Sequence, residues 1–108
     1  MVYVLNSPIL TDFGLYRYKG ITTMQAKEIL KNGTFVSAIG HEATANLLSN
    51  LLEVEIKYNR ISIVMQAGDI AVVFRLMTRL NEGQVLKLNE LCDKDYTLGL
   101  LERLKEGV

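Results

Sequence analysis

The apolar residues of this chain are divided among short runs, and the longest uninterrupted run spans only a few residues. A helix that crosses a bilayer needs about 20 apolar residues in succession, so we expect no membrane partner. The 108 residues fall within the usual size of one domain, and no Pro- or Ser-rich linker divides them. We therefore expect one domain, residues 1–108, built around a single core.

Short β-prone runs alternate with helical patterns along the chain. Val2–Leu5 ends at the polar loop Asn6-Ser7-Pro8, and Phe13–Tyr18 alternates in the manner of an edge strand. The remaining runs expected to form strands are Thr34–Ile39, Asn59–Met65 and Ile70–Met77, with Tyr96–Leu101 as a last strand or a helical tail. Ala67-Gly68-Asp69 is typical of a hairpin turn, which predicts antiparallel pairing of residues 59–65 with residues 70–77.

Helix signals separate these runs. Thr22 and Gln25 have the spacing of a capping box, and Asn32-Gly33 predicts a left-handed stop at glycine. Gly40 opens a second helix, in which apolar residues recur at three- and four-residue spacing. These residues are Ala43, Leu47, Leu48 and Leu51. With a short helix expected at Leu88–Leu91, the order of elements predicts an α/β (α+β) fold, a small mixed β-sheet flanked by helices.

The net charge is zero, because 12 Lys and Arg residues balance 12 Asp and Glu residues. Proteins that grip long DNA or RNA non-specifically need a clustered basic face, so we expect no long nucleic acid partner. A few arginines can still converge on one small anion. The N-terminus lacks the basic region of a secretory signal, and the single cysteine, Cys92, cannot form an internal disulfide. Both features favour a cytoplasmic protein, with Cys92 as core filler.

His41 is the one histidine, and we expect it in the first turn of the helix that follows Gly40. That turn has unpaired N–H groups and a partial positive charge, so it suits a phosphate, which the small Gly40 allows to approach the backbone. A histidine there can protonate a leaving oxygen. It can equally be a cap or surface residue without chemistry. A lone histidine and a lone cysteine form no zinc ligand set, and no cofactor is implied.

Three arginines and one glutamate are further candidates. Arg79 and Glu82 flank a turn after the longest strand, where Arg79 suits two oxygens of a phosphate and Glu82 can orient His41. The alternative for this pair is a surface ion pair. Arg60, at the start of a predicted strand, and Arg75, within an apolar one, either line a ligand site or mark an exposed face. Residue spacing alone leaves these alternatives open.

Taken together, these segments resemble the viral ring nucleases, small type III anti-CRISPR proteins of archaeal viruses, bacteriophages and integrated elements of bacteria. The resemblance covers nearly the whole chain. It is carried by Leu5-Asn6-Ser7, the stretch Ser37-Ala38-Ile39-Gly40-His41-Glu42-Ala43-Thr44, the pair Asn59-Arg60, and Arg79-Leu80-Asn81-Glu82-Gly83. Its most specific part is Ile-Gly-His-x-x-Thr joined to a distant Arg-Leu-x-Glu-Gly.

The resemblance implies a homodimer that binds one cyclic tetra-adenylate across its two-fold axis and cleaves it without metal. The products would be linear di-adenylates with a 2′,3′-cyclic phosphate. His41 would protonate the departing 5′-oxygen, Arg79 would stabilise the phosphoryl charge, and Glu82 would support the histidine. The positions that would hold the ring are Asn6, Ser7, Gly40, Thr44, Arg60 and Arg75. Arg75 departs from the family pattern, in which a glutamine stands there.

Two other functions compete with this expectation. The chain can be a module of the same fold that sequesters the cyclic nucleotide without cutting it, and turnover separates the two. It can also be a small viral or mobile-element regulatory protein that binds a protein partner. That alternative predicts no affinity for cyclic oligoadenylate and no effect of His41→Ala.

Overall fold

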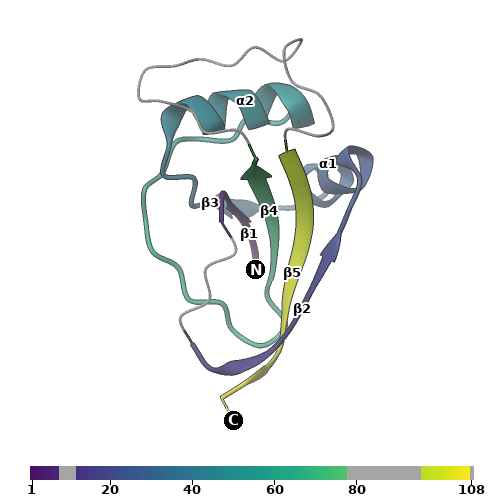
Figure 1. Ribbon diagram of the computed structural model, residues 1–108, viewed down its shortest axis with the longest axis vertical. Helices are drawn as coiled ribbons and strands as arrows, with labels where there is room; N and C mark the ends of the chain where they lie inside the picture. Colours follow the sequence, from purple (N-terminus) through teal and green to yellow (C-terminus); the bar gives the residue numbers. More distant parts are fainter. Residues whose placement is uncertain (8–11, 78–95, 108) are drawn as a thin grey trace.

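The computed structural model describes residues 1–7, 12–77 and 96–107, where one five-stranded sheet packs against two helices (Figure 1). The strands are β1 (Val2–Leu5), β2 (Gly14–Gly20), β3 (Phe35–Ser37), β4 (Ile70–Leu76) and β5 (Tyr96–Glu106). The helices are α1 (Thr23–Lys31) and α2 (Glu42–Leu52). The predicted class, a small mixed sheet flanked by helices, is confirmed.

The strand order β2-β5-β4-β1-β3 gives β1 two parallel neighbours. β5 runs antiparallel to both of its neighbours, β4 and β2. Because parallel strands end on the same side of a sheet, the C-termini of β1, β3 and β4 meet along one side, here called the carboxyl edge. β2 is an edge strand, as predicted, and residues 96–106 form a strand rather than a helical tail.

Both helices pack on one face of the sheet, here called the helix face. Its buried cluster consists mainly of Val4, Val72, Phe74 and Leu98 from the strands, Ala26 and Leu30 from α1, and Ala45, Leu47, Leu48 and Leu52 from α2. The helices present these side chains together because apolar residues recur at three- and four-residue spacing. Burial of this surface is the main force that holds α1 and α2 on the sheet.

The start of α1 is a capping box, as predicted. Gln25 N donates to Thr22 Oγ1 at 3.1 Å, and Thr22 N donates to Gln25 Oε1 at 2.9 Å. The helix stops at Asn32, in the predicted place, but the predicted left-handed glycine is wrong, because Gly33 does not have a positive φ. Asn32 instead closes the last turn by donating its backbone N–H to Glu28 O at 3.3 Å.

Residues 59–65 are not a strand, so the predicted hairpin with residues 70–77 is wrong. β4 already pairs with β1 on one side and β5 on the other, which leaves it no free edge. The segment packs instead against the second face of the sheet. There Met65 and Ile63 join a cluster with Leu5, Ala71, Val73 and Leu101. We call residues 59–65 the cover segment and this face the cover face.

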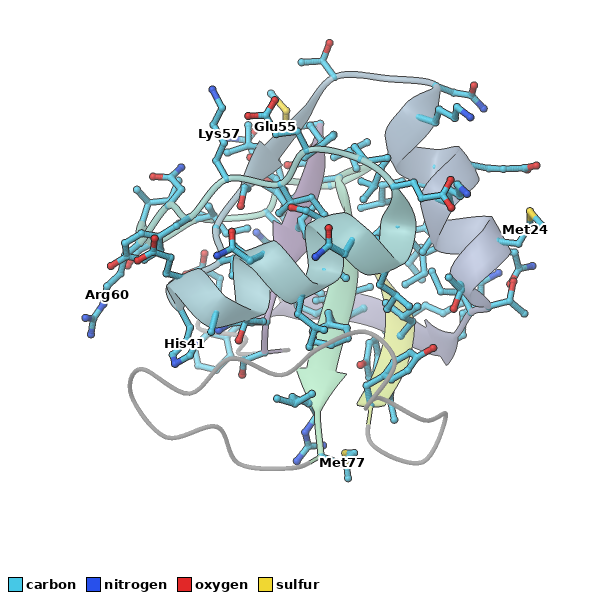
Figure 2. All side chains as sticks on the ribbon, turned by 90° about the horizontal axis from the view of Figure 1, so that it is seen from above. Met24, His41, Glu55, Lys57, Arg60 and Met77 are labelled. Atoms are coloured by element: carbon cyan, nitrogen blue, oxygen red, sulfur yellow. The ribbon has the colours of Figure 1, made fainter. Side chains whose placement is uncertain are left out.

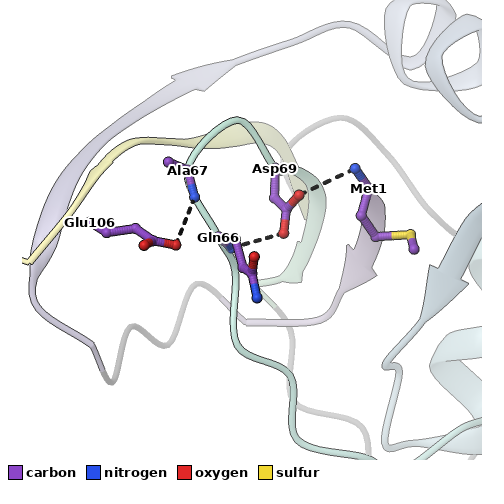
Figure 3. Close-up of polar contacts among 5 residues, drawn as sticks. All are labelled: Met1, Gln66, Ala67, Asp69 and Glu106. Atoms are coloured by element: carbon purple, nitrogen blue, oxygen red, sulfur yellow. Dashed lines mark hydrogen bonds and ion pairs between the residues drawn. The ribbon is translucent and has the colours of Figure 1, made fainter.

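The turn after the cover segment is real, although it leads into β4 from outside the sheet. Gly68 has a φ of 92°, and Asp69 N donates to Gln66 O at 2.9 Å. The Asp69 carboxylate accepts from Gln66 N at 2.8 Å and from the Met1 ammonium at 3.2 Å, while Glu106 accepts from Ala67 N at 3.3 Å (Figure 3). These contacts join the turn to the start of β1 and the end of β5.

Candidate functional site

His41 is the N-cap of α2 and not, as predicted, part of its first turn. Its φ of −138° and ψ of 119° are extended values, and the helix begins one residue later, at Glu42. The difference arises because the side chain of His41 does the capping, a role that requires a non-helical backbone. The histidine therefore lies just outside the free N–H groups of α2, beside any anion bound to them.

Thr44 holds the imidazole ring of His41. Thr44 N donates to His41 Nδ1 at 3.3 Å, and Thr44 Oγ1 lies 3.2 Å from the same nitrogen. The Thr44 residue is only 7% exposed, so its hydroxyl is largely occupied by this contact. Because Nδ1 faces the helix, Nε2 is the ring nitrogen left for a ligand. The prediction that Thr44 binds a ligand itself stays a prediction.

Gly40 lies under the side chain of Arg60. A Cβ atom built on Gly40 would come within 3.3 Å of Arg60 Cγ, so the aliphatic part of the arginine packs over the glycine. Figure 2 shows His41 at the start of α2 and Arg60 projecting outward from the neighbouring segment. The structure thus brings four of the predicted site residues together at one end of α2, namely Gly40, His41, Thr44 and Arg60.

Residues 57–60 are fastened to the end of β3, and this fixes the position of Arg60. Ser37 Oγ donates to Lys57 O at 2.6 Å, and Asn59 Nδ2 donates to Ser37 O at 2.8 Å. Asn59 N also donates to Ile39 O at 2.9 Å. Sequence reasoning singled out Asn59 only as a neighbour of Arg60 and missed the positioning role of Ser37.

Asn6 and Ser7 line a hollow of about 440 Å³ at the carboxyl edge. Leu5 and Ala38 complete its inner side, and residues 61–64 of the cover segment form its outer wall. Ala38 is tied to β1 by the bond from its N–H to Val4 O at 2.9 Å. Since only Ile39 and Gly40 separate Ala38 from His41, the hollow lies near the start of α2. Asn6 and Ser7 are therefore brought to the same edge as His41.

Arg75 is exposed near the end of β4. Val73 pairs with Leu5, and residues 73 and 75 share the cover face because side chains alternate along a strand. Arg75 consequently lies on the side of the sheet where the hollow opens, two positions nearer the carboxyl edge than Val73. This position fits either of the alternatives left open by the sequence.

The remaining predicted site residues, Arg79 and Glu82, lie outside the described residues, as do Cys92 and the predicted helix Leu88–Leu91. The described chain leaves β4 at Met77, at the carboxyl edge (Figure 2). Within residues 1–7, 12–77 and 96–107, no group of three His, Cys, Asp or Glu side chains could hold a metal ion. In the same residues, neither helix is long and apolar enough to span a membrane.

Comparison with known proteins shows similar proteins in viruses and in a bacterium. The family model described as STIV B116-like matches residues 2–98. The chain is 43% identical over 108 residues to protein 26 of Sulfolobus islandicus filamentous virus, covering 94% of this chain and 91% of the relative. It is 35% identical over 102 residues to YddF of Bacillus subtilis, covering 93% and 94% of the two chains.

A solved structure shares the fold. B116 of Sulfolobus turreted icosahedral virus matches with a TM-score of 0.79 and 24% sequence identity, over 94% of this chain and 98% of that one. At this identity the likeness concerns the fold, which supports the strand order and helix packing described above.

Proposed function

Because this chain belongs to the STIV B116-like family, with relatives in archaeal viruses, we propose that it is a metal-independent ring nuclease. Its substrate would be cyclic tetra-adenylate, cut to linear di-adenylates with a 2′,3′-cyclic phosphate by a homodimer in the cytoplasm of a prokaryotic host. It would thereby counter type III CRISPR signalling. The observation that carries the proposal is the imidazole of His41, held through Nδ1 at the open N-terminus of α2 beside Gly40 and Arg60.

The groups around His41 suit a cyclic ribonucleotide. The free N–H groups of α2 favour a phosphate, and Arg60 adds a guanidinium that never loses its charge. The hollow beside them combines apolar walls with Asn6 and Ser7, a mixture that accommodates a base or ribose. A phosphate at α2 and a nucleoside in the hollow would lie next to each other, as they do within one nucleotide.

The contact with Thr44 suits an acid that gives up a proton from Nε2. Thr44 N can donate to Nδ1 only while that nitrogen carries no proton. In the imidazolium form this bond is replaced by Nδ1–H donating to Thr44 Oγ1, and Nε2–H is free to face the leaving group. The ribose 2′-hydroxyl loses its proton to solvent as its oxygen bonds to phosphorus. The bond from phosphorus to the 5′-oxygen breaks, and that oxygen takes the Nε2 proton. His41 is left neutral with its proton on Nδ1.

Two roles in the proposal come from the resemblance and stay predictions. Arg79 would stabilise charge on the phosphoryl oxygens, and Glu82 would keep His41 charged and oriented. A two-fold dimer would present two copies of His41 to opposite linkages of a four-unit ring.

The first experiment follows the labelled ring by chromatography in excess EDTA. Purified protein should convert it to di-adenylate, and His41→Ala should slow turnover by roughly 10²- to 10⁴-fold while binding is retained. Thr22→Ala is the matched control, because it removes the N-cap of the other helix and should leave turnover unchanged. Light scattering with and without the ring tests the dimer.

Each contrary result has a distinct meaning. An intact ring after long incubation with stoichiometric protein would reject the nuclease. If the ring is then still bound tightly, the sequestering module takes its place. Absence of both binding and turnover would favour the regulatory interaction protein. Full activity in His41→Ala would keep the nuclease but reject His41 as its acid.

A further inference from the structure

Arg103, three residues before the end of β5, is a buried cation. It is 5% exposed, and among the described residues no carboxylate pairs with it. Its Nη1 donates to Met65 O, its Nη2 donates to Phe13 O at 2.6 Å, and the guanidinium lies 5.5 Å from the centre of the Tyr16 ring. Backbone carbonyls and an aromatic face thus replace the usual acidic partner.

Such an arrangement is costly for a residue that only fills space. Burying a guanidinium is unfavourable unless hydrogen bonds compensate, and an apolar side chain of similar volume is often as stable or more so. Here Nε is buried and has no hydrogen-bond partner among the described residues. The reason for burying an arginine here is therefore sought in the two chain segments that its side chain joins, at Met65 and at Phe13.

One of the two accepting carbonyls belongs to a segment that encloses the hollow. Met65 is the last residue of the cover segment, whose residues 61–64 form the outer wall. Phe13 comes six positions after Ser7, which lines the inner side. One side chain thus joins the end of the cover segment to Phe13, the residue before β2.

The cover segment has few other attachments. Its first residues are fixed by Asn59 and Ser37, and the turn that follows it is fixed by Asp69 (Figure 3). Arg103 strengthens that turn as well, since Gly68 N donates to Arg103 O at 2.9 Å and Arg103 N to Asp69 O at 3.2 Å. For residues 62–65, the bond to Met65 O is the one hydrogen bond to other residues in the described part of the chain.

We propose that Arg103 is a positioning residue that holds the cover segment against the sheet and so sets the shape of the hollow. The inference rests on the proposed function, in which the hollow receives one nucleoside of the ring. Arg103 acts on the wall of the site at Met65 and shares no contact partner with His41 among the described residues. Its loss should therefore weaken substrate binding and leave the chemical step nearly unchanged.

The test compares Arg103→Met, which keeps length without donors, with Arg103→Lys, which keeps the charge and can restore one bond. With cyclic tetra-adenylate, Arg103→Met should raise KM about tenfold, as expected for losing bonds from a charged donor, with kcat within about twofold. Arg103→Lys should lie between it and the unmutated protein. Without ligand, the amides of Gln66, Gly68 and Asp69, which donate hydrogen bonds directly after Met65, should exchange at least about tenfold faster in Arg103→Met, while those of α2 keep their rates.

Leu98→Ala is the control, because it destabilises the same strand from the helix face without touching the cover segment. It should leave KM and the exchange of Gln66, Gly68 and Asp69 unchanged. Unchanged exchange in Arg103→Met, or a fall in kcat at constant KM, overturns the inference. If Arg103→Met does not fold, the same measurements on Arg103→Lys decide. If the unmutated protein does not cleave the ring, the proposed function fails, and the exchange rates still decide whether Arg103 positions the segment.

Discussion

The N-termini of α1 and α2 are closed in different ways. At α1, Thr22 and Gln25 form a reciprocal pair of hydrogen bonds that satisfies two backbone donors. At α2, His41 caps with a ring nitrogen at 3.3 Å, although histidine is not among the residues that cap helices best. The difference indicates that the start of α1 serves stability, whereas the start of α2 retains a side chain suited to proton transfer.

The strongest way to break this comparison is His41→Asn. Asparagine is a preferred N-cap but cannot act as the acid, so turnover of the ring should fall by roughly 10²- to 10⁴-fold. The free energy of unfolding should rise by about 0.5 kcal/mol or more. Activity by chromatography and urea denaturation measure the two effects. A variant that is less stable than the original protein would show that the histidine was chosen for its capping.

Thr44 offers a finer test of the same end. Thr44→Val removes the hydroxyl beside Nδ1 and keeps the backbone N–H that caps through the neutral ring, so we expect kcat to fall about tenfold, a typical effect of losing one hydrogen bond to a charged group. Thr44→Ser should recover most of the activity. Because His41 is the one histidine, nitrogen NMR can follow its ring without ambiguity. The two variants should differ in the signal of Nδ1, and equal kcat values would refute the positioning role.

Loss of the capping box of α1 should lower stability without affecting turnover. Thr22→Ala should lower the free energy of unfolding by about 1 kcal/mol, because it leaves a helix donor without its acceptor. Turnover should stay the same at temperatures where the variant is folded. Thermal or urea denaturation gives the first quantity. A loss of activity in the folded variant would remove the functional distinction between the two helix starts.

The smallest predicted effect concerns the far end of α2. Lys27 Nζ lies 2.6 Å from Glu53 Oε2, and this bond lowers the pKa of Glu53 below its ordinary value of 4.5. Because the pKa of Glu53 is lower in the folded than in the unfolded protein, its ion pair adds stability at pH values above the pKa of the unfolded chain. That stability is lost as the pH falls through the pKa of the folded protein. Lys27→Met should therefore lower the free energy of unfolding slightly at neutral pH. Below the pKa of Glu53 in the folded protein, the variant and the original protein should be equally stable. Urea denaturation across acidic pH checks this, and a constant difference would contradict it.

Local signals in the sequence explain what could be predicted. Thr22 and Gln25 are enough to predict the start of α1. His41 has no strong cap signature, so the sequence predicts a start of α2 that is too early. The alternation of Ile61, Ile63 and Met65 predicts a strand that does not form, and only Met65 of the three is fully buried, since Ile63 is half-buried and Ile61 is exposed. The place of this segment against a sheet face was not predictable locally, because β1 and β5, distant in sequence, occupy both sides of β4.

The candidate site shows the same division. Asn6, His41 and Arg60 could be selected by residue type and by resemblance, and the parallel strands bring them to one edge. Ser37 and Arg103 could not, because a serine in a strand and an arginine near the end of the chain carry no signature of the segments they hold. Their roles appear only when residues far apart in the sequence meet.

The place of β5 between β2 and β4 also bears on how the protein is made. During translation, β2 leaves the ribosome early, yet the strand it pairs with begins only at Tyr96. Until residues 96–106 have been made, β2 has no strand to pair with, and one edge of β4 is unpaired. Nascent chains are therefore expected to stay sensitive to proteases and aggregation until residues 96–106 have been synthesised.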